Sequence, residues 1–133
     1  MEVVQKITIP TFVDERGSLS VIEIADFVDW QVKRIYYVTD TKMSRGGHSV
    51  KGEKKLYVCV QGSVTGKFHD GEKWIEFSLK GPGEAVRMDD YCWREFDQFS
   101  EGSVLMAISN MAYEKDKYIM DFDEHVKYYN GVK

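Results

Sequence analysis

The feature that most constrains the fold of this sequence is a pair of strand-like runs on either side of Asp70-Gly71. Residues 64–69 and 72–79 are both rich in β-branched and aromatic residues. Asp-Gly favours a tight turn between antiparallel strands, because both central residues readily take a positive φ. The pair therefore predicts a β-hairpin and favours an antiparallel β fold. His69 adjoins the turn, where we expect it to be exposed.

Short runs of the same kind recur through the chain. The other expected strands cover residues 3–9, 19–24, 32–38, 56–60, 84–88 and 104–109, with a further strand entered from a loop over 89–96. Turn residues at 14–17 predict a hairpin that ends in the 19–24 strand. Only the tail has helical spacing, from a cap at Asp121 to a stop at Gly131. This pattern predicts an all-β antiparallel barrel or sandwich with a short C-terminal helix.

Composition limits the partners and the compartment. The 133 residues fit one domain, and the net charge of −4 comes without a block of like charges, so we expect neither nucleic acid nor membrane as a partner. The sequence has no long apolar run and no signal-peptide layout, which predicts a cytoplasmic protein. Cys59 and Cys92 are expected to be reduced core thiols. The three histidines lie far apart in the sequence, so we expect no metal and no cofactor.

A histidine near the start of a strand is the candidate for chemistry. Arg45-Gly46-Gly47 leads into His48 and then into the apolar run 56–60, so His48 is expected at the mouth of the barrel. An imidazole with a pKa of about 6.5 can move a proton at neutral pH, although a histidine there can also simply hydrogen-bond the rim. Residues 53–55 are most simply interpreted as a solvated turn.

Several elements fall in the order and spacing of one enzyme family. They are Phe12-x-Asp14-x-Arg16-Gly17-x-Leu19, Arg34-x-Tyr36-Tyr37, Arg45-Gly46-x-His48-x-x-Lys51, Gly62, Asp70-Gly71, Trp93 and Tyr118-Ile119. In this ordered set the chain resembles the sugar 3,4-ketoisomerases, cupin-fold enzymes that act on dTDP-4-keto-6-deoxyglucose in deoxysugar biosynthesis. The resemblance covers roughly residues 5–125.

The resemblance implies a single cupin-like domain over residues 1–133 with a jelly-roll barrel that holds a dTDP-sugar. It also implies a metal-independent homodimer with an exchanged N-terminal strand. The family motif carries a second histidine two residues after the first, and this chain has Val50 at that position. In the family the position of Arg94 holds histidine or arginine and bears on which face of C4 receives the proton.

The expected activity is proton transfer through an enediolate, with His48 as the base. Tyr36 and Tyr37 are the other catalytic candidates, because a phenol can donate to a developing oxyanion. They alternate along their strand, so we do not expect both to reach the ligand from one face. Cationic and aromatic side chains suit the diphosphate and the base of the nucleotide. The substrate-binding candidates are Arg16, Arg34, Arg45, Lys51, Trp93 and Arg94.

Two alternatives stay open. A site with one histidine also suits an enzyme like the dTDP-4-keto sugar 3,5-epimerases, which the Arg-Gly-x-His element also resembles. In that chemistry a base removes a carbon proton on one face and an acid returns one on the other. The third possibility is a non-catalytic module that binds a nucleotide-sugar.

Overall fold

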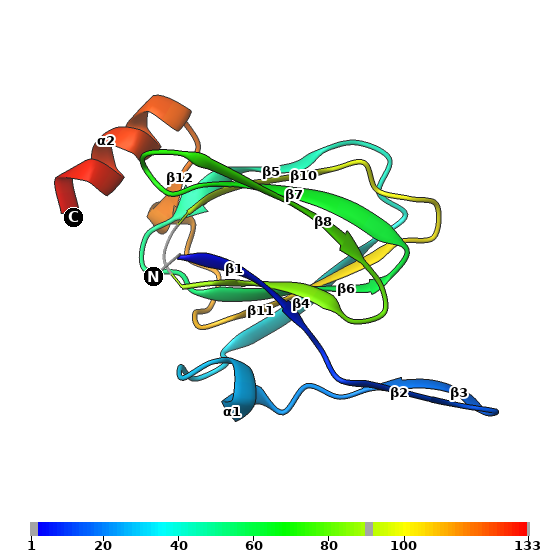
Figure 1. Cartoon of the computed structure of the whole chain (residues 1–133). Coiled ribbons are helices and arrows are strands. Elements are labelled where there is room, and N and C mark those ends of the chain that lie inside the picture. The colour runs from blue at the N-terminus through cyan, green and yellow to red at the C-terminus, as the bar shows by residue number, and fades with distance from the viewer. Residues whose placement is uncertain (1–2, 90–91, 133) are drawn as a thin grey trace.

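Two five-stranded antiparallel sheets pack face to face in a computed structural model that describes residues 3–89 and 92–132 (Figure 1). The first sheet has the order β1 (Val4–Thr8), β9 (Glu84–Met88), β6 (Lys55–Gln61), β11 (Val104–Ser109) and β4 (Arg34–Thr39). The second has the order β12 (Tyr118–Ile119), β5 (Arg45–Val50), β10 (Trp93–Asp97), β7 (Ser63–His69) and β8 (Trp74–Lys80). The all-β class predicted from the sequence is confirmed.

The hairpin predicted around Asp70-Gly71 is present. β7 and β8 pair from Ser63↔Lys80 to His69↔Trp74, and Gly71 has a φ of +96° in the turn. The prediction that His69 is exposed is wrong, because only 6% of its surface is accessible. Its ring lies among those of Trp74, Phe122 and His125, since the C-terminal helix packs over this end of the hairpin.

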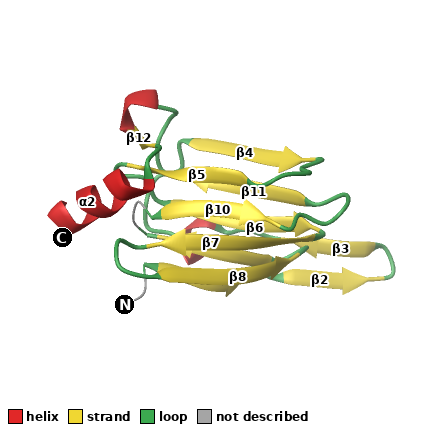
Figure 2. Cartoon of the chain, turned by 90° about the horizontal axis from the view of Figure 1, so that it is seen from above, coloured by secondary structure: helices red, strands yellow, loops and turns green. Residues whose placement is uncertain are grey.

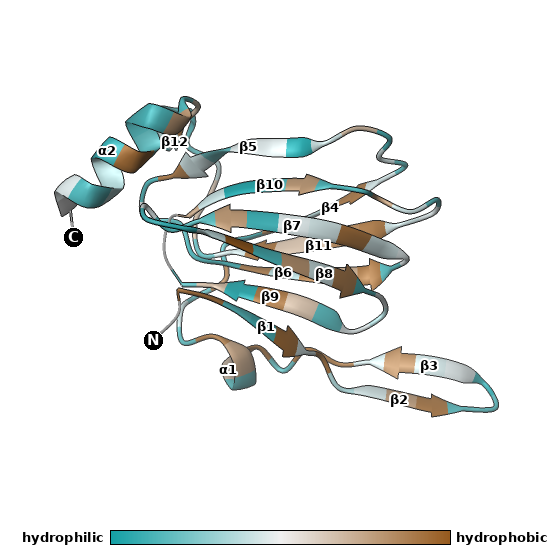
Figure 3. Ribbon diagram, turned by 45° about the horizontal axis from the view of Figure 1, so that its top comes forward, coloured by the Kyte–Doolittle hydropathy of each residue, from teal (hydrophilic) through white to brown (hydrophobic). Residues whose placement is uncertain are grey.

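A second hairpin projects from the sandwich. β2 (Thr11–Asp14) and β3 (Gly17–Ser20) form a two-stranded sheet of their own in the described chain and extend past the end of the first sheet (Figures 1 and 2). Phe12, Val13 and Leu19 on this hairpin are exposed by 65%, 75% and 59%, and Figure 3 shows apolar residues on both strands. The predicted strand over 19–24 is too long: β3 ends at Ser20, and a short helix, α1 (Ile24–Phe27), follows.

The main core fills the space between the sheets. Tyr57, Phe68 and Phe96 form its aromatic centre, with ring centroids 4.7 to 6.0 Å apart. A second apolar cluster lies on the other face of the first sheet, where α1 and its flanks cover the side chains that alternate with those of the core. Cys59 and Cys92 are both buried in the core and form no disulfide with each other, as predicted.

The C-terminal helix α2 (Phe122–Val132) closes one end of the sandwich, after a 3₁₀ turn, η1 (Lys115–Lys117) (Figure 1). Asp121 caps it as predicted, since its Oδ1 accepts from the backbone N–H groups of Asp123 and Glu124 at 2.8 and 3.2 Å. Gly131 lies within the helix instead of ending it. His125 is fully buried and joins the carbonyl of His69 to the hydroxyl of Ser49.

No helix in the described part of the chain is long and apolar enough to span a membrane.

Gly71 offers a test of how α2 is seated on the hairpin. A Cβ at Gly71 would lie 2.4 Å from Cδ1 of Tyr129, whereas a Cβ at Gly52, which has a similar positive φ of +80°, would meet nothing within 4 Å. We expect Gly52→Ala to lower the free energy of unfolding by about 1 kcal/mol through backbone strain alone. Gly71→Ala should lower it by about 2–3 kcal/mol more, because Tyr129 must move.

Urea unfolding at one fixed chain concentration measures both variants. Equal losses for the two alanines would contradict this account of how α2 packs.

Candidate active site

A pocket opens between the two sheets and is lined by residues of both. Its cavity volume is about 100 Å³, which is room for several water-sized groups. The polar part of the wall is formed by Tyr36, Arg45, His48 and Arg94. The apolar part includes Val38, Phe96, Phe99, Leu105 and Ala107. The combination of an apolar wall with a few convergent polar groups is typical of a small-molecule site.

His48 lies on β5 directly opposite Arg94 of β10. Its ring also packs against that of Tyr118, with centroids 4.9 Å apart. Burial, with Arg94 and Lys55 nearby, lowers the pKa of His48 to about 4. The imidazole is therefore neutral at neutral pH and able to accept a proton.

Tyr36 and Tyr37 point to opposite sides of β4, as the alternation predicts. Tyr36 lines the pocket, and Tyr37 does not line it and is 69% exposed. The Tyr36 hydroxyl lies 2.7 Å from Nζ of Lys55. Partial burial raises the pKa of Tyr36, so its hydroxyl keeps its proton at neutral pH and can donate it.

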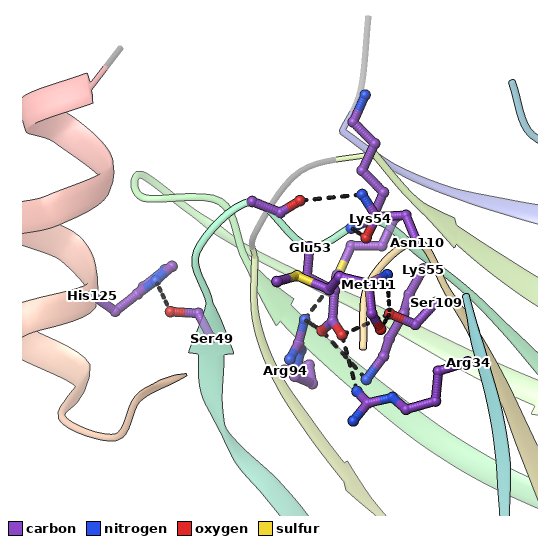
Figure 4. Close-up of polar contacts among 12 residues, drawn as sticks. Arg34, Ser49, Glu53, Lys54, Lys55, Arg94, Ser109, Asn110, Met111 and His125 are labelled. Atoms are coloured by element: carbon purple, nitrogen blue, oxygen red, sulfur yellow. Dashed lines mark hydrogen bonds and ion pairs between the residues drawn. The ribbon is translucent and has the colours of Figure 1, made fainter. Parts of the chain in front are cut away.

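Behind the pocket wall lies a buried cluster of charges around Glu53 (Figure 4). Its Oε1 lies 3.0 Å from Nη2 of Arg94 and 3.3 Å from Nζ of Lys55. Its Oε2 lies 3.3 Å from Nη2 of Arg34 and accepts a hydrogen bond from Ser109 at 2.9 Å. Glu53, Lys55 and Arg94 are each exposed by 1% or less.

The prediction that residues 53–55 form a solvated turn is wrong, because Glu53 and Lys55 face inward. The signal that would have found Lys55 is the alternation of β6, which places it on the same side as Tyr57 and Cys59, both in the core. Nothing comparable marks Glu53, since it precedes the strand and its partners other than Lys55 come from β4, β10 and β11.

One carboxylate cannot balance three nearby cations, and the pKa values follow from this. Burial, then Arg94, lowers the pKa of Lys55 to about 7, although Glu53 opposes the shift. Burial would raise the pKa of Glu53, but Arg94 and Lys55 outweigh it and hold that pKa below its usual value. Glu53 is therefore ionised at neutral pH, while Lys55 is close to half protonated.

Arg94, on the wall of the pocket, has hydrogen-bond donors that are available to a ligand. Its Nη2 is bound to Glu53, but its Nε and Nη1 are buried without a hydrogen-bond partner among the described residues. Buried donors without a partner are uncommon in folded proteins. The arrangement suits a ligand oxygen that bears negative charge.

The structure places the remaining predicted residues away from this pocket. Arg16 lies at the tip of the projecting hairpin and pairs with Asp14, with 87% of its side chain exposed. Lys51 lies over the ring of Tyr128, and Trp93 packs against Phe122 and His125 of α2. Arg34 does not line the pocket and reaches the charge cluster behind it.

Val50 is buried, with 1% of its surface exposed, two residues after His48 on β5. Two residues along a strand is one full period, so both side chains emerge on the same side. The pocket side of β5 therefore carries one imidazole in the pocket wall followed by an aliphatic side chain.

Comparison with known proteins gives consistent matches over nearly the whole chain. The family model described as "FdtA: WxcM-like, C-terminal" matches residues 2–130. A TDP-4-oxo-6-deoxy-alpha-D-glucose-3,4-oxoisomerase from Aneurinibacillus thermoaerophilus is 33% identical over 118 residues, which are 87% of this chain and 85% of that protein.

Two solved structures have the same fold. A 3,4-ketoisomerase from Helicobacter canadensis has a TM-score of 0.88 at 29% identity and covers 96% of this chain and 97% of its own. A variant of the 3,4-ketoisomerase QdtA from Thermoanaerobacterium thermosaccharolyticum, in complex with TDP-4-keto-6-deoxyglucose, has a TM-score of 0.90 at 26% identity and covers 98% of this chain and 96% of its own. The two-sheet sandwich with a short C-terminal helix is therefore cupin-like.

The buried lysine makes a prediction for stability. The pKa of Lys55 is about 7 in the folded chain and 10.5 as its ordinary value, so above about pH 7 the unfolded chain binds a proton that the folded chain lacks. The free energy of unfolding should therefore rise between about pH 7 and pH 9.5, by at most about 1.4 kcal/mol per pH unit.

Urea denaturation of wild type and Lys55→Met across this pH range tests the prediction. The rise in the free energy of unfolding should disappear in Lys55→Met. Lys54→Met is the matched control, because the side chain of Lys54 lies outside the charge cluster and the rise should remain. A rise that persists in Lys55→Met would contradict the assignment.

Proposed function

Since this chain belongs to the FdtA, WxcM-like family, we propose that it is a TDP-sugar 3,4-ketoisomerase acting on a 4-keto-6-deoxyhexose. The observation that carries the proposal is the neutral imidazole of His48 in a pocket that also presents Tyr36 and two arginines. The similarity to 3,4-ketoisomerases over nearly the full length supports the same assignment. We further propose that residues 1–133 form a single cupin-like domain.

The reaction begins at the carbon next to the ketone. His48 takes the proton from C3, and the electrons of that C–H bond move toward the carbonyl at C4 to form an enediolate. The protonated His48, whose ring proton exchanges with water, then delivers a proton to C4, so that the carbonyl ends at C3. A positioned base of this kind typically contributes about 10²–10⁴-fold to the rate.

The negative charge that develops on oxygen requires donors that are already in place. Tyr36 presents its hydroxyl in the same pocket, and Arg94 has two donors without a protein partner in the described chain. We assign both to the substrate oxygens, because donors fixed by the protein stabilise an oxyanion without reorganising. Tyr37, on the outer side of β4, has no place in this step within one subunit.

We assign binding of the nucleotide's diphosphate to Arg45, which lines the pocket and is exposed at the start of β5. A guanidinium meets phosphate oxygens in pairs, which suits this role. The parts of Arg34, Lys51 and Trp93 in substrate binding stay predictions.

We also propose a homodimer, in which the hairpin β2–β3 contacts a second subunit. This hairpin projects from the sandwich with three large apolar side chains exposed, which is costly unless another surface covers them. The exchanged element is then the hairpin instead of β1, because β1 already pairs with β9 of its own chain. Arg16 at the tip would reach the partner's pocket.

Isotope exchange tests the function. The purified protein is incubated with TDP-4-keto-6-deoxyglucose in deuterated water and followed by NMR. We expect a 3-keto product with deuterium at C4, and His48→Asn should abolish both the product and the label because the base is lost.

Other outcomes would overturn the proposal in distinct ways. Exchange at C3 or C5 with inversion, without a 3-keto product, would indicate a 3,5-epimerase-like enzyme. Binding of TDP without any exchange would indicate a non-catalytic nucleotide-sugar-binding module. Full activity in His48→Asn would refute the assignment of the base alone.

The dimer is tested by sedimentation of Leu19→Asp. A charge in an apolar contact lacks a partner, so this variant should shift from dimer to monomer at micromolar concentration. Met120→Asp is the matched control, because Met120 is 65% exposed on the segment before α2, outside the hairpin, and should leave the dimer intact. A wild-type monomer, or a Leu19→Asp dimer of unchanged affinity, would contradict the proposal.

A further inference from the structure

The isomerisation proposed above moves two protons, and His48 accounts for one. His48 takes the proton of C3 and delivers a proton to C4, whereas a second proton must leave the hydroxyl oxygen on C3 and arrive on the oxygen of C4. Val50 lies two residues beyond His48 on the same side of β5, and its side chain has no exchangeable proton. The oxygen proton therefore needs another carrier.

We propose that Lys55 is this carrier and acts through the hydroxyl of Tyr36. The inference rests on the proposed function, because it assigns the oxygen half of that reaction. Nζ of Lys55 lies 2.7 Å from the Tyr36 oxygen, Tyr36 faces the pocket, and Lys55 sits behind it with 1% of its surface exposed. Tyr36 is the catalytic residue that touches the substrate, and Lys55 is a positioning residue that returns a proton to the Tyr36 hydroxyl.

The surroundings of Lys55 allow it both to give and to take a proton. It faces charged and titratable groups from each element packed around it: Glu53 before β6, Arg34 and Tyr36 on β4, Tyr57 on β6, His48 on β5 and Arg94 on β10. Glu53 holds the ammonium in place at 3.3 Å, while burial and the arginines bring the pKa of Lys55 to about 7. A lysine at its ordinary pKa of 10.5 would give up its proton far less readily.

The proton transfers balance without any further reactant. As His48 takes the hydrogen of C3, Tyr36 gives its phenolic proton to the oxygen of C4 and receives one from the Lys55 ammonium. The proton from Tyr36 thereby converts the enediolate into a neutral enediol, with His48 protonated and Lys55 as the amine. Tyr36 then accepts the proton of the C3 hydroxyl while passing its own to Lys55, and His48 protonates C4. The carbonyl has moved, and every side chain has regained its starting form.

The relay predicts a distinctive pH profile. The free enzyme must hold His48 neutral and Lys55 protonated, so kcat/KM should rise through about pH 4 and fall above about pH 7. Wild-type protein alone gives this measurement. A kcat/KM that stays constant from about pH 6 to pH 9 would overturn the relay.

Substitutions separate a proton carrier from a fixed charge. Lys55→Met should lower kcat by about 10²–10⁴-fold, leave KM nearly unchanged and remove the fall above pH 7. Lys55→Arg keeps the positive charge, but an arginine holds its proton far above neutral pH, so it should not restore the rate. Recovery of wild-type kcat by Lys55→Arg would show that only the charge matters and would contradict the relay.

A double substitution and two controls complete the test. Because Lys55 and Tyr36 act as one unit, Lys55→Met with Tyr36→Phe should lose no more activity than the worse single variant, and multiplicative losses would count against the relay. Lys54→Met should match wild type, and TDP binding with cooperative unfolding checks that each variant folds. If wild type isomerises the sugar and Lys55→Met does so at the same rate, the relay is wrong but the proposed function stands. If wild type does not isomerise the sugar, the proposed function itself is wrong.

Discussion

The buried carboxylate of Glu53 is the interaction on which the rest of the site depends. It draws together Arg34 of β4, Lys55 of β6, Arg94 of β10 and the hydroxyl of Ser109 on β11. These strands belong to both sheets, so one anion joins the two layers at the base of the pocket. Buried ion pairs of this kind often add little net stability, because desolvation offsets the attraction. What this cluster contributes is the position and the protonation state of the groups that face the cavity.

The fold was largely readable from local pattern. Asp70-Gly71 marked its hairpin and Asp121 marked its helix start, because turns and caps depend on a few neighbouring residues. The sequence predictions were wrong where contacts with segments far along the chain determine the local structure. His69 follows the pattern of an exposed turn residue, but a helix more than fifty positions later covers it. The strand expected to run to Ile24 ends early, since residues 24–27 fold as α1 over the outer face of the first sheet.

The residues of the site likewise include some that the sequence predicts and some that it does not. Alternation on β4 correctly separated Tyr36 from Tyr37, and family resemblance brought out His48, Arg45 and Arg94, which the structure gathers in one pocket. The charged pair at 53 and 55 was missed because ionised side chains are expected at the surface unless their partners are known. Those partners lie up to 56 residues away along the chain, so composition and spacing could not indicate them.

The way the two sheets meet at the pocket has a consequence for ligand entry. β4 is the outer strand of its sheet and pairs with β11, while β5 pairs with β10 and β12, so these two walls share no backbone ladder in the described chain. Widening the gap between them would therefore break no rung of either sheet. A ligand at this rim thus meets two strand edges that no backbone hydrogen bond joins in the described chain.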